Sequence, residues 1–322
     1  MTPAVPAASR PRRLVFAGEA LVDVVMRVPG LPPRGGDILA TSSQVAVGGG
    51  FNVMAAAARQ GLPVLYAGGH GTGPWGELVR AALAAEGIGL LRPADPSRDT
   101  GFDVALVESD AERTFVTSLG AESMSEPGSW DEVKAAPGDA VYVSGYGLVA
   151  PGPGAMLAAW AAALPPGVLL FVDPGPLAAQ IPGPVLGPVL ARCDWLSGNA
   201  REAGLLGGWA GQEEGAGPEE AARRLLARTG RAGVIVRDGP AGCFLALRPD
   251  AVAHLPAPTV VAVDTTGAGD AHSGVFLAAL ADGRPPASAA RRANAAAALA
   301  VTRPGPATCP SRAELDAWLA RA

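Results

Sequence analysis

The segment DTTGAGDAHSGVF, residues 264 to 276, joins a bend of very small side chains to a run with helical character. The backbone amides of Gly267, Ala268 and Gly269 can converge at the amino end of that helix, where the helix dipole favours an anion. Asp270 lies beside this position and would be repelled by a bound anion, which indicates a chemical purpose. We interpret Asp270 as the general base for a hydroxyl that attacks a phosphoryl group held by these amides. The alternative is that the two aspartates of the segment only shape the turn and cap the helix.

A second glycine-rich stretch, VGGGFNVMAAAARQG, occupies residues 47 to 61 and leads into a helical pattern. Three consecutive glycines cost backbone entropy wherever the chain holds them still, which indicates either close approach of a ligand or a very tight turn. Asn52 at the helix entrance can cap the helix or point its amide toward that ligand, and Gly61 suits the helix end. From this stretch alone, a ligand site and a plain turn are equally supported.

Residues 71 to 76, GTGPWG, match the G-x-G-x-x-G pattern of dinucleotide-binding loops and precede a helical run. A dinucleotide fold also needs a second parallel strand that ends in an acid about twenty residues later. The chain instead reads GIGLLRPADPSRDTG there and then enters an alternating apolar pattern. A tight turn between strand and helix is therefore favoured, and an NAD-dependent oxidoreductase is the weaker alternative.

Lysine usage excludes several kinds of mechanism. Only Lys134 is a lysine among the 25 basic residues, and it lies in the polar segment SWDEVKAAPG. A Walker-A loop, a protein-kinase strand lysine or a pyridoxal Schiff base would all have to use that residue. The three cysteines and three histidines are widely scattered, and no H-E-x-x-H or G-x-S-x-G string occurs, which argues against a zinc hydrolase and a serine esterase.

The bulk composition is typical of a soluble globular chain without a nucleic-acid or membrane partner. The 322 residues are 49% hydrophobic and 17% charged, with a net charge of -5 and no long uninterrupted apolar run. Nucleic-acid binding requires clustered Arg and Lys, and no basic stripe occurs. The basic start MTPAVPAASRPRR is followed too soon by Glu19 and Asp23 for a signal peptide, so we expect a cytoplasmic location.

The order of apolar runs predicts one α/β domain over residues 10 to 322. From Ala140 onward, strand-like runs such as AVYVSG and VLLFVD alternate with helical stretches, which is typical of βαβ units and a buried parallel sheet. In the first half, VDVVMRV, ILATSSQVAV, GFDVALVES and RTFVTSL alternate like antiparallel strands. We interpret these segments, at about 20 to 47 and 98 to 122, as a small β appendage.

The two glycine motifs resemble the signatures of the ribokinase-like, or PfkB-type, family of small-molecule kinases. DTTGAGDAHSGVF is close to the family's D-T-x-G-A-G-D string, and GGGFNVMAAAARQG is similar to its glycine-rich helix opening. The resemblance extends from about Leu14 to Leu319. It implies a ribokinase-like α/β fold, with a central, mostly parallel sheet flanked by helices and a small β lid over the sugar. In this family the lid often serves as a dimer interface too.

The resemblance also implies roles for residues at matching positions. Asp270 is similar to the catalytic base, and the bend before it to the family's anion hole. The residues that would contact the acceptor are Asp23, Gly49, Gly50 and Asn52. Those that would contact ATP are Asn199, Arg237, Gly239 and Asn294. Glu202 would bind Mg²⁺ through water, and Asp264 and Thr266 would bind a monovalent cation. The loop TRPGPATC, residues 302 to 309, would close the cation site.

Departures from the family pattern narrow the expected acceptor. Gly50 stands where members acting on phosphorylated sugars often have lysine, so a phosphorylated acceptor is disfavoured. The strand VYVSGYG ends without the glutamate that ribokinases tend to have there, which weakens the case for ribose.

We therefore predict ATP-dependent phosphorylation of a hydroxymethyl group on an unphosphorylated monosaccharide, fructose- or ribose-like, or on a nucleoside. Mg²⁺ is the expected cofactor and K⁺ a candidate activator. Two further possibilities are kept: the chain forms a homodimer through the lid, or it is a non-catalytic nucleotide or sugar sensor on the same fold.

Overall fold

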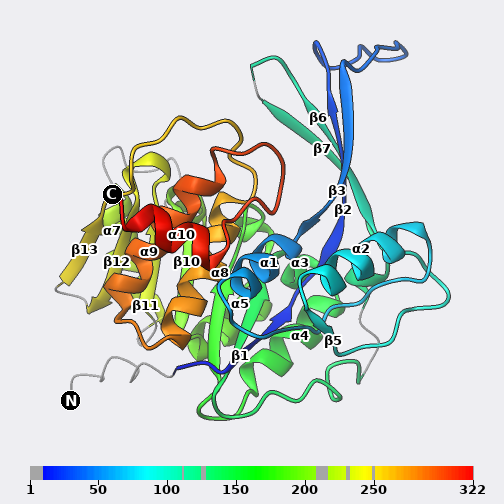
Figure 1. Cartoon of the computed structure of the whole chain (residues 1–322). Helices are drawn as coiled ribbons and strands as arrows, with labels where there is room; N and C mark the ends of the chain where they lie inside the picture. Colours follow the sequence, from blue (N-terminus) through cyan, green and yellow to red (C-terminus); the bar gives the residue numbers. More distant parts are fainter. Residues whose placement is uncertain are drawn as a thin grey trace.

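The structure is a computed structural model that describes residues 10–110, 112–124, 128–207, 217–229, 233–248 and 251–321. Within these residues, a large sheet is covered by helices on both faces, and a smaller sheet rises from it (Figure 1). The smaller sheet is called the lid below. The two sheets together place the candidate site residues.

The large sheet contains nine strands in the described ranges, in the order β13-β12-β11-β10-β9-β8-β1-β4-β5. Neighbouring strands from β11 to β5 run parallel, whereas β12 pairs antiparallel with both β11 and β13. The bounds are β1 Arg13–Ala17, β4 Val64–Tyr66, β5 Gly89–Leu90, β8 Asp139–Ser144, β9 Leu169–Asp173, β10 Trp195–Asn199, β11 Gly233–Arg237, β12 Cys243–Arg248 and β13 Ala251–Leu255. The predicted parallel sheet is present, and the antiparallel edge hairpin was not foreseen.

The central strands consist almost entirely of residues that suit burial on both faces. All residues of β8 and β9 are buried, and their sequences DAVYVS and LLFVD are rich in Val, Leu and aromatic side chains. Successive side chains of a strand point to opposite faces, so Leu14 and Phe16 enter one apolar core while Val15 and Ala17 enter the other. A parallel sheet of this kind needs helices on both sides.

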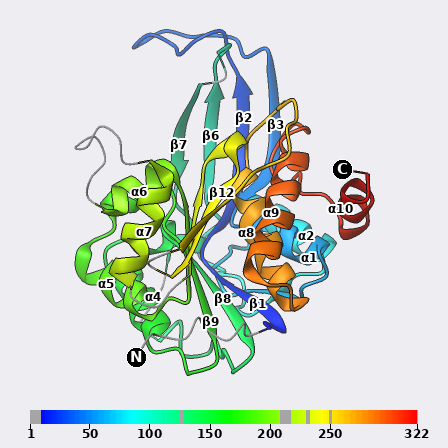
Figure 2. The same cartoon turned by 90° about the vertical axis from the view of Figure 1, so that its left-hand side faces the viewer.

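Two helical layers supply that cover (Figure 2). One layer contains α1, α2, α8, α9 and α10, and the other contains α3, α4, α5, α6 and α7. Their bounds are α1 Phe51–Arg59, α2 Pro74–Ala85, α3 Tyr146–Val149, α4 Pro153–Ala162, α5 Gly183–Arg192, α6 Ala200–Gly207, α7 Pro218–Thr229, α8 Ala268–Ala281, α9 Pro286–Ala300 and α10 Arg312–Leu319. No helix in the described ranges is long and apolar enough to cross a membrane.

The lid is a four-stranded sheet in the order β3-β2-β6-β7. Its strands are β2 Ala20–Arg27, β3 Ser42–Gly49, β6 Phe102–Val107 and β7 Arg113–Ser118. The pairs β2–β3 and β6–β7 are antiparallel, but β2 and β6 run parallel to each other. Figures 1 and 2 both show the lid standing above the carboxyl ends of the parallel strands. The sequence predicted antiparallel strands here but not the parallel seam between the two hairpins.

Candidate active site

Three neighbouring parallel strands end in polar residues at the same edge of the large sheet. Asp173 is the last residue of β9, Asn199 of β10 and Arg237 of β11. Asn199 and Arg237 are direct partners in the strand register. Ligands of open α/β sheets bind outside the carboxyl ends of the strands, so the topology gathers these side chains where a ligand site is expected.

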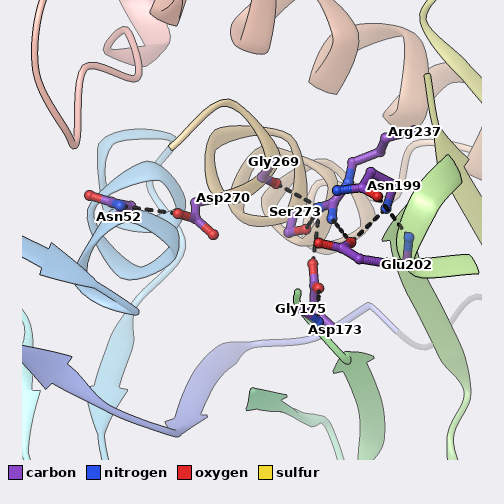
Figure 3. Close-up of polar contacts among 9 residues, drawn as sticks. All are labelled: Asn52, Asp173, Gly175, Asn199, Glu202, Arg237, Gly269, Asp270 and Ser273. Atoms are coloured by element: carbon purple, nitrogen blue, oxygen red, sulfur yellow. Dashed lines mark hydrogen bonds and ion pairs between the residues drawn. The ribbon is translucent and has the colours of Figure 1, made fainter. Parts of the chain in front are cut away.

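Arg237 is the centre of a buried ion-pair cluster (Figure 3). Its Nη1 donates to Asp173 Oδ2 at 3.0 Å, and its Nη2 donates to Glu202 Oε2 at 3.4 Å. Burial alone would lower the pKa of this guanidinium, but the charges of Asp173 and Glu202 raise it. The three side chains are only 13%, 10% and 8% exposed, so each charge depends on the others for compensation.

The start of α6 fixes the glutamate of this cluster. The Asn199 backbone N–H donates to Glu202 Oε2 at 2.7 Å, and the Glu202 N–H donates to Asn199 Oδ1 at 2.9 Å. This reciprocal pair satisfies two backbone donors at the helix start, as a capping box does. Burial raises the pKa of Glu202, and the nearby Asp173 charge raises it further. The N-x-x-E pattern therefore forms one rigid unit.

The bend before α8 has the geometry of an open helix start. Gly267 adopts a left-handed φ of 72°, and an added Cβ would lie 3.4 Å from the Asn52 side chain. Ala268 begins the helix, and the first amides of an α-helix have no acceptor within it. The Gly269 carbonyl is held from the opposite side, because it accepts from Arg237 Nη1 at 3.0 Å. The bend is thereby tied to the strand edge.

Asp270 points toward the helix that follows the glycine run. Asn52 Nδ2 donates to Asp270 Oδ2 at 3.0 Å, although the two residues are 218 positions apart. Figure 3 shows this contact on one side of the first turn of α8 and the Arg237 cluster on the other. Burial raises the pKa of Asp270 to about 6, the Asn52 hydrogen bond opposes the rise, and the Asp173 charge adds to it. Such a carboxylate is ionised at neutral pH and can accept a proton.

The consecutive glycines before α1 are each required for a different reason. An added Cβ on Gly48 would overlap the Asp23 carboxylate on the neighbouring strand, and one on Gly50 would overlap the Phe16 ring. Gly49 has a left-handed φ of 60°. The run is therefore a tight turn that also leaves room for Asp23 above it.

Two acids of the lid lie side by side. Asp23 on β2 and Asp103 on β6 are direct partners in the parallel register. Burial, together with the charges of Asp103 and Asp270, raises the pKa of Asp23 to about 7. Burial also raises the pKa of Asp103 to about 6. Asp103 Oδ1 is buried and, among the residues that the structure describes, has no hydrogen-bond partner. The two carboxyl groups are also hydrogen-bonded to each other. Because a buried carboxylate oxygen without a donor is costly, Asp103 Oδ1 is suited to accept a hydroxyl group of a ligand.

A third acid comes from the turn between β1 and the lid. Ser144 Oγ, at the end of β8, donates to Glu19 Oε1 at 3.0 Å. Burial raises the pKa of Glu19 to about 7. The end of β8 therefore has a carboxylate beside it, which comes from the turn between β1 and β2.

The two remaining residues predicted to contact the nucleotide have defined places. Asn294 is buried on α9, and its Nδ2 donates to the carbonyls of Leu255 at 2.8 Å and Pro256 at 3.3 Å. Gly239 opens a short 3₁₀ turn after β11 with a φ of 51°. Asn294 thus anchors the end of β13, and its contact with adenine stays a prediction.

Asp264 and Thr266 lie together just before the bend. The Thr266 N–H and Oγ1 donate to Asp264 Oδ1 at 2.9 and 2.7 Å, and the Gly305 N–H donates to Oδ2 at 3.1 Å. Arg113 Nη2 of the lid also donates to Oδ1, at 2.6 Å. Burial alone would raise the pKa of Asp264, but these hydrogen bonds and the Arg113 charge lower it to about 2.

The GTGPWG motif is occupied by a side chain of the protein itself. The Trp75 and Gly76 amides at the start of α2 donate to the two carboxylate oxygens of Asp99, at 3.0 and 2.8 Å. An added Cβ on Gly73 would overlap the same carboxylate. The helix start that a dinucleotide phosphate would need is already filled, so the expected tight turn is what the structure contains.

Comparison with known proteins identifies this arrangement. A family model for pfkB family carbohydrate kinases matches residues 11–313. The chain belongs to the pfkB family of carbohydrate kinases. It is 34% identical over 316 residues to the uncharacterized sugar kinase YegV of Escherichia coli strain K12, covering 94% of this chain and 92% of that protein. It is 30% identical to the ribokinase of Haemophilus influenzae, covering 97% and 99%.

The fold is confirmed by solved structures as well. The structure of Arabidopsis thaliana ribokinase complexed with ribose and ATP matches with a TM-score of 0.75 and 23% identity, covering 96% of this chain and 99% of that one. The predicted ribokinase-like fold is thus correct, and this pfkB-family chain is a small-molecule kinase. An oxidoreductase and a ligand sensor are not favoured.

Sequence reasoning missed four polar residues at this site: Asp173, Ser273, Asp103 and Glu19. Asp173 could have been found, because it ends the buried run VLLFVD at the edge where parallel strands meet. Ser273, which accepts from Arg237 Nη1 at 3.1 Å, lies one helical turn after Asp270 and was a candidate by spacing. Asp103 and Glu19 depend on the pairing of distant strands, which the sequence pattern does not specify.

Proposed function

We propose that this pfkB-family kinase transfers the γ-phosphoryl group of ATP to a hydroxymethyl group of an unphosphorylated monosaccharide or nucleoside. The observation that supports the proposal is the contact of Asp270 with Asn52 of α1, because it leaves a buried carboxylate of pKa about 6 beside the bend that begins α8. The Arabidopsis ribokinase complexed with ribose and ATP supports ATP as the donor.

In the proposed reaction, Asp270 acts as the general base. It accepts the proton of the acceptor hydroxyl while that oxygen forms a bond to the γ-phosphorus, and the bond from that phosphorus to the bridging oxygen breaks to release ADP. The amides of Gly267, Ala268 and Gly269 stabilise the negative charge on the transferred group. Asp270 then loses its proton to solvent. The products are a phosphate monoester, ADP and a proton.

The acceptor is proposed to lie between the lid and the glycine run. Asp23 and Asp103 offer carboxylate oxygens for sugar hydroxyls, and Asn52 adds a side-chain amide. Gly49 and Gly50 would contribute backbone groups of the tight turn before α1. The acids would repel an acceptor that already carries phosphate. Neutral polyhydroxylated acceptors are therefore favoured.

The residues around Arg237 are suited to bind the phosphoryl donor, MgATP. Magnesium binds proteins through one or two carboxylates and completes its shell with water and substrate phosphates, and Asp173 and Glu202 match that preference. When bound, Mg²⁺ would neutralise phosphate charge during transfer. Arg237 keeps both carboxylates in place and fixes the Gly269 carbonyl. We propose Asn199, Arg237, Gly239 and Asn294 as the nucleotide side of the site.

The lid offers a surface for self-association. Val45, Phe115 and Val116 are 50%, 56% and 64% exposed on its two outer strands. Apolar side chains gathered on one sheet favour a homodimer through the lid, as the family resemblance implies. A cytoplasmic location stays a prediction from the sequence.

The test is ADP release over a panel of pentoses, hexoses, nucleosides and sugar phosphates with MgATP. Wild type is expected to turn over at least one neutral acceptor. Asp270→Asn should lower kcat by on the order of 10² to 10⁴ while ATP affinity changes little. Near-normal turnover in Asp270→Asn would show that Asp270 is not the base. Absence of turnover with every acceptor would contradict the proposed function.

A further inference from the structure

The loop before α8 has a carboxylate whose oxygens already carry several donors. Asp264 Oδ1 accepts from the Thr266 N–H, from Thr266 Oγ1 and from Arg113 Nη2, and Oδ2 accepts from the Gly305 N–H. The ion pair with Arg113 is short, at 2.6 Å, and largely shielded, since the two side chains are 28% and 11% exposed. Asp264 is three residues before Gly267, so whatever holds Asp264 also holds the anion-binding bend.

The family resemblance places a monovalent cation at Asp264 and Thr266, and the residues present do not fit one in this structure. The guanidinium of Arg113 puts a full positive charge on the same oxygen that the cation would use. Two unit charges of the same sign a few ångströms apart repel each other strongly where solvent is partly excluded. A second positive charge beside Asp264 is therefore disfavoured while Arg113 is in place.

A second arginine engages the other side of this expected cation site. Arg59 Nη1 donates to the carbonyls of Ala307 at 2.5 Å and Cys309 at 3.0 Å, and Glu86 neutralises its charge. These carbonyls belong to the loop that was expected to close around the ion. Their oxygens are engaged by a guanidinium as well, so the loop is already held without an ion.

Arg113 belongs to the lid and lies at the end of the β6–β7 hairpin that is farthest from the large sheet (Figure 1). Arg113 is the first residue of β7 and pairs with Val107, the last residue of β6. Asp103 lies at the other end of β6, one residue after its start. The ion pair with Asp264 therefore joins the far end of the lid hairpin to the loop that leads into α8. Asp103 lies nearer the root of the same hairpin, and Asp23 lies beside it on the neighbouring strand β2.

We infer that Arg113 is a positioning residue that takes the place of a monovalent cation and fastens the lid to the anion-binding bend. The inference rests on the proposed function for its link to catalysis, since it assigns Arg113 to the phosphoryl-binding side of that site. The enzyme then needs no potassium, and acceptor binding under the lid is coupled to the geometry of the bend.

The first test compares cations at constant ionic strength, with KCl or choline chloride as the only salt and the best acceptor of the ADP-release panel. Wild type should change by less than about twofold between the two salts. In choline, Arg113→Ala should lose roughly tenfold to a hundredfold in kcat/KM for the acceptor, the size expected for a lost charged hydrogen bond. Added KCl should restore a large part of that loss, because the cation site is now open.

Matched variants separate positioning from general charge effects. Arg27→Ala removes another lid arginine, an exposed one at the end of β2, and should behave as wild type in both salts. Arg113→Lys keeps the charge and should retain more activity than Arg113→Ala in choline. Strong activation of wild type by potassium would overturn the inference, as would unchanged activity of Arg113→Ala in choline or its failure to respond to potassium.

A thermal-denaturation arm does not depend on turnover. Potassium alone should raise the Tm of Arg113→Ala relative to choline and leave the Tm of wild type unchanged, since only the variant has room for the ion. Equal responses of the two proteins would contradict the inference. If wild type phosphorylates no acceptor, the proposed function fails, and this measurement still decides whether Arg113 occupies the cation position.

Discussion

The two halves of the candidate site neutralise charge in opposite ways. Around Arg237, each carboxylate has a guanidinium or backbone donor, and the cluster is complete without a ligand. Under the lid, Asp23 and Asp103 are direct partners in the strand register, and burial raises the pKa of both. The proposed nucleotide side is thus organised by internal ion pairs, whereas the proposed acceptor side contains carboxyl groups of raised pKa.

The largest effect is expected where the internal pairing is broken. Arg237→Ala leaves Asp173 and Glu202 buried without their partner, so the free energy of unfolding should fall by about 3–5 kcal/mol. Urea denaturation measures this. The control is Arg223→Ala on α7, whose ion pairs with Glu219 and Glu220 are exposed to solvent and contribute little to stability. Similar losses in both variants would mean that the Arg237 cluster is not stabilising.

A stability gain is expected on the acceptor side. The pKa of Asp23 is raised when folded, so its destabilising effect grows as pH rises from its ordinary value near 4 and is complete above about 7. Asp23→Asn should therefore be more stable than wild type by roughly 1–3 kcal/mol at pH 8 and similar to it at pH 4 to 5. Urea denaturation at both pH values measures the difference. Asp37→Asn, in an exposed lid loop, is the control, and a pH-independent difference would contradict the assignment.

A smaller effect should follow from filling the space beneath Asp23. Gly48→Ala places a Cβ against that carboxylate, so the KM for the acceptor should rise by about tenfold, or roughly 1.4 kcal/mol, while the KM for ATP stays within about twofold. Gly30→Ala is the matched control, because a Cβ there makes only an ordinary contact with Glu108. Equal changes in both KM values would place Asp23 outside the acceptor site.

The smallest expected effect is a shift in the pH profile. Asp270 must be ionised to act as base, so kcat/KM should fall tenfold per unit as pH drops below about 6. The Asn52 hydrogen bond lowers the pKa of Asp270, so Asn52→Ala should move this acid limb upward by about one unit. An unshifted limb would mean that another group controls it.

Local patterns were sufficient to predict much of this molecule. The parallel sheet followed from buried runs such as VLLFVD, and the helix after the DTTGAGD bend begins where the small residues predicted its amino end. The sequence also placed Asp270 at the first turn of a helix, where the structure has it. Each of these depends on neighbours within a few residues.

Features that depend on distant pairing could not be predicted. The parallel register of Asp23 with Asp103, the approach of Glu19 to Ser144 and the bond of Arg113 to Asp264 join segments far apart in the chain. Nothing in the alternation of a strand reveals which strand lies next to it. The β12–β13 hairpin was missed for a similar reason, since the buried part of β12 follows the same apolar pattern as a parallel strand, and the edge strand β13 is mostly exposed.

The carboxylate that caps α2 has a consequence for how the lid can move. Asp99 holds the start of α2, and its neighbour Thr100 accepts from the Gly71 N–H at 2.9 Å, immediately before β6 begins. The root of the second hairpin is therefore pinned to the body whether or not a ligand is bound. Because the Arg113–Asp264 ion pair holds the far end of the same hairpin, an opening movement of the lid would have to break that ion pair while the root stays in place.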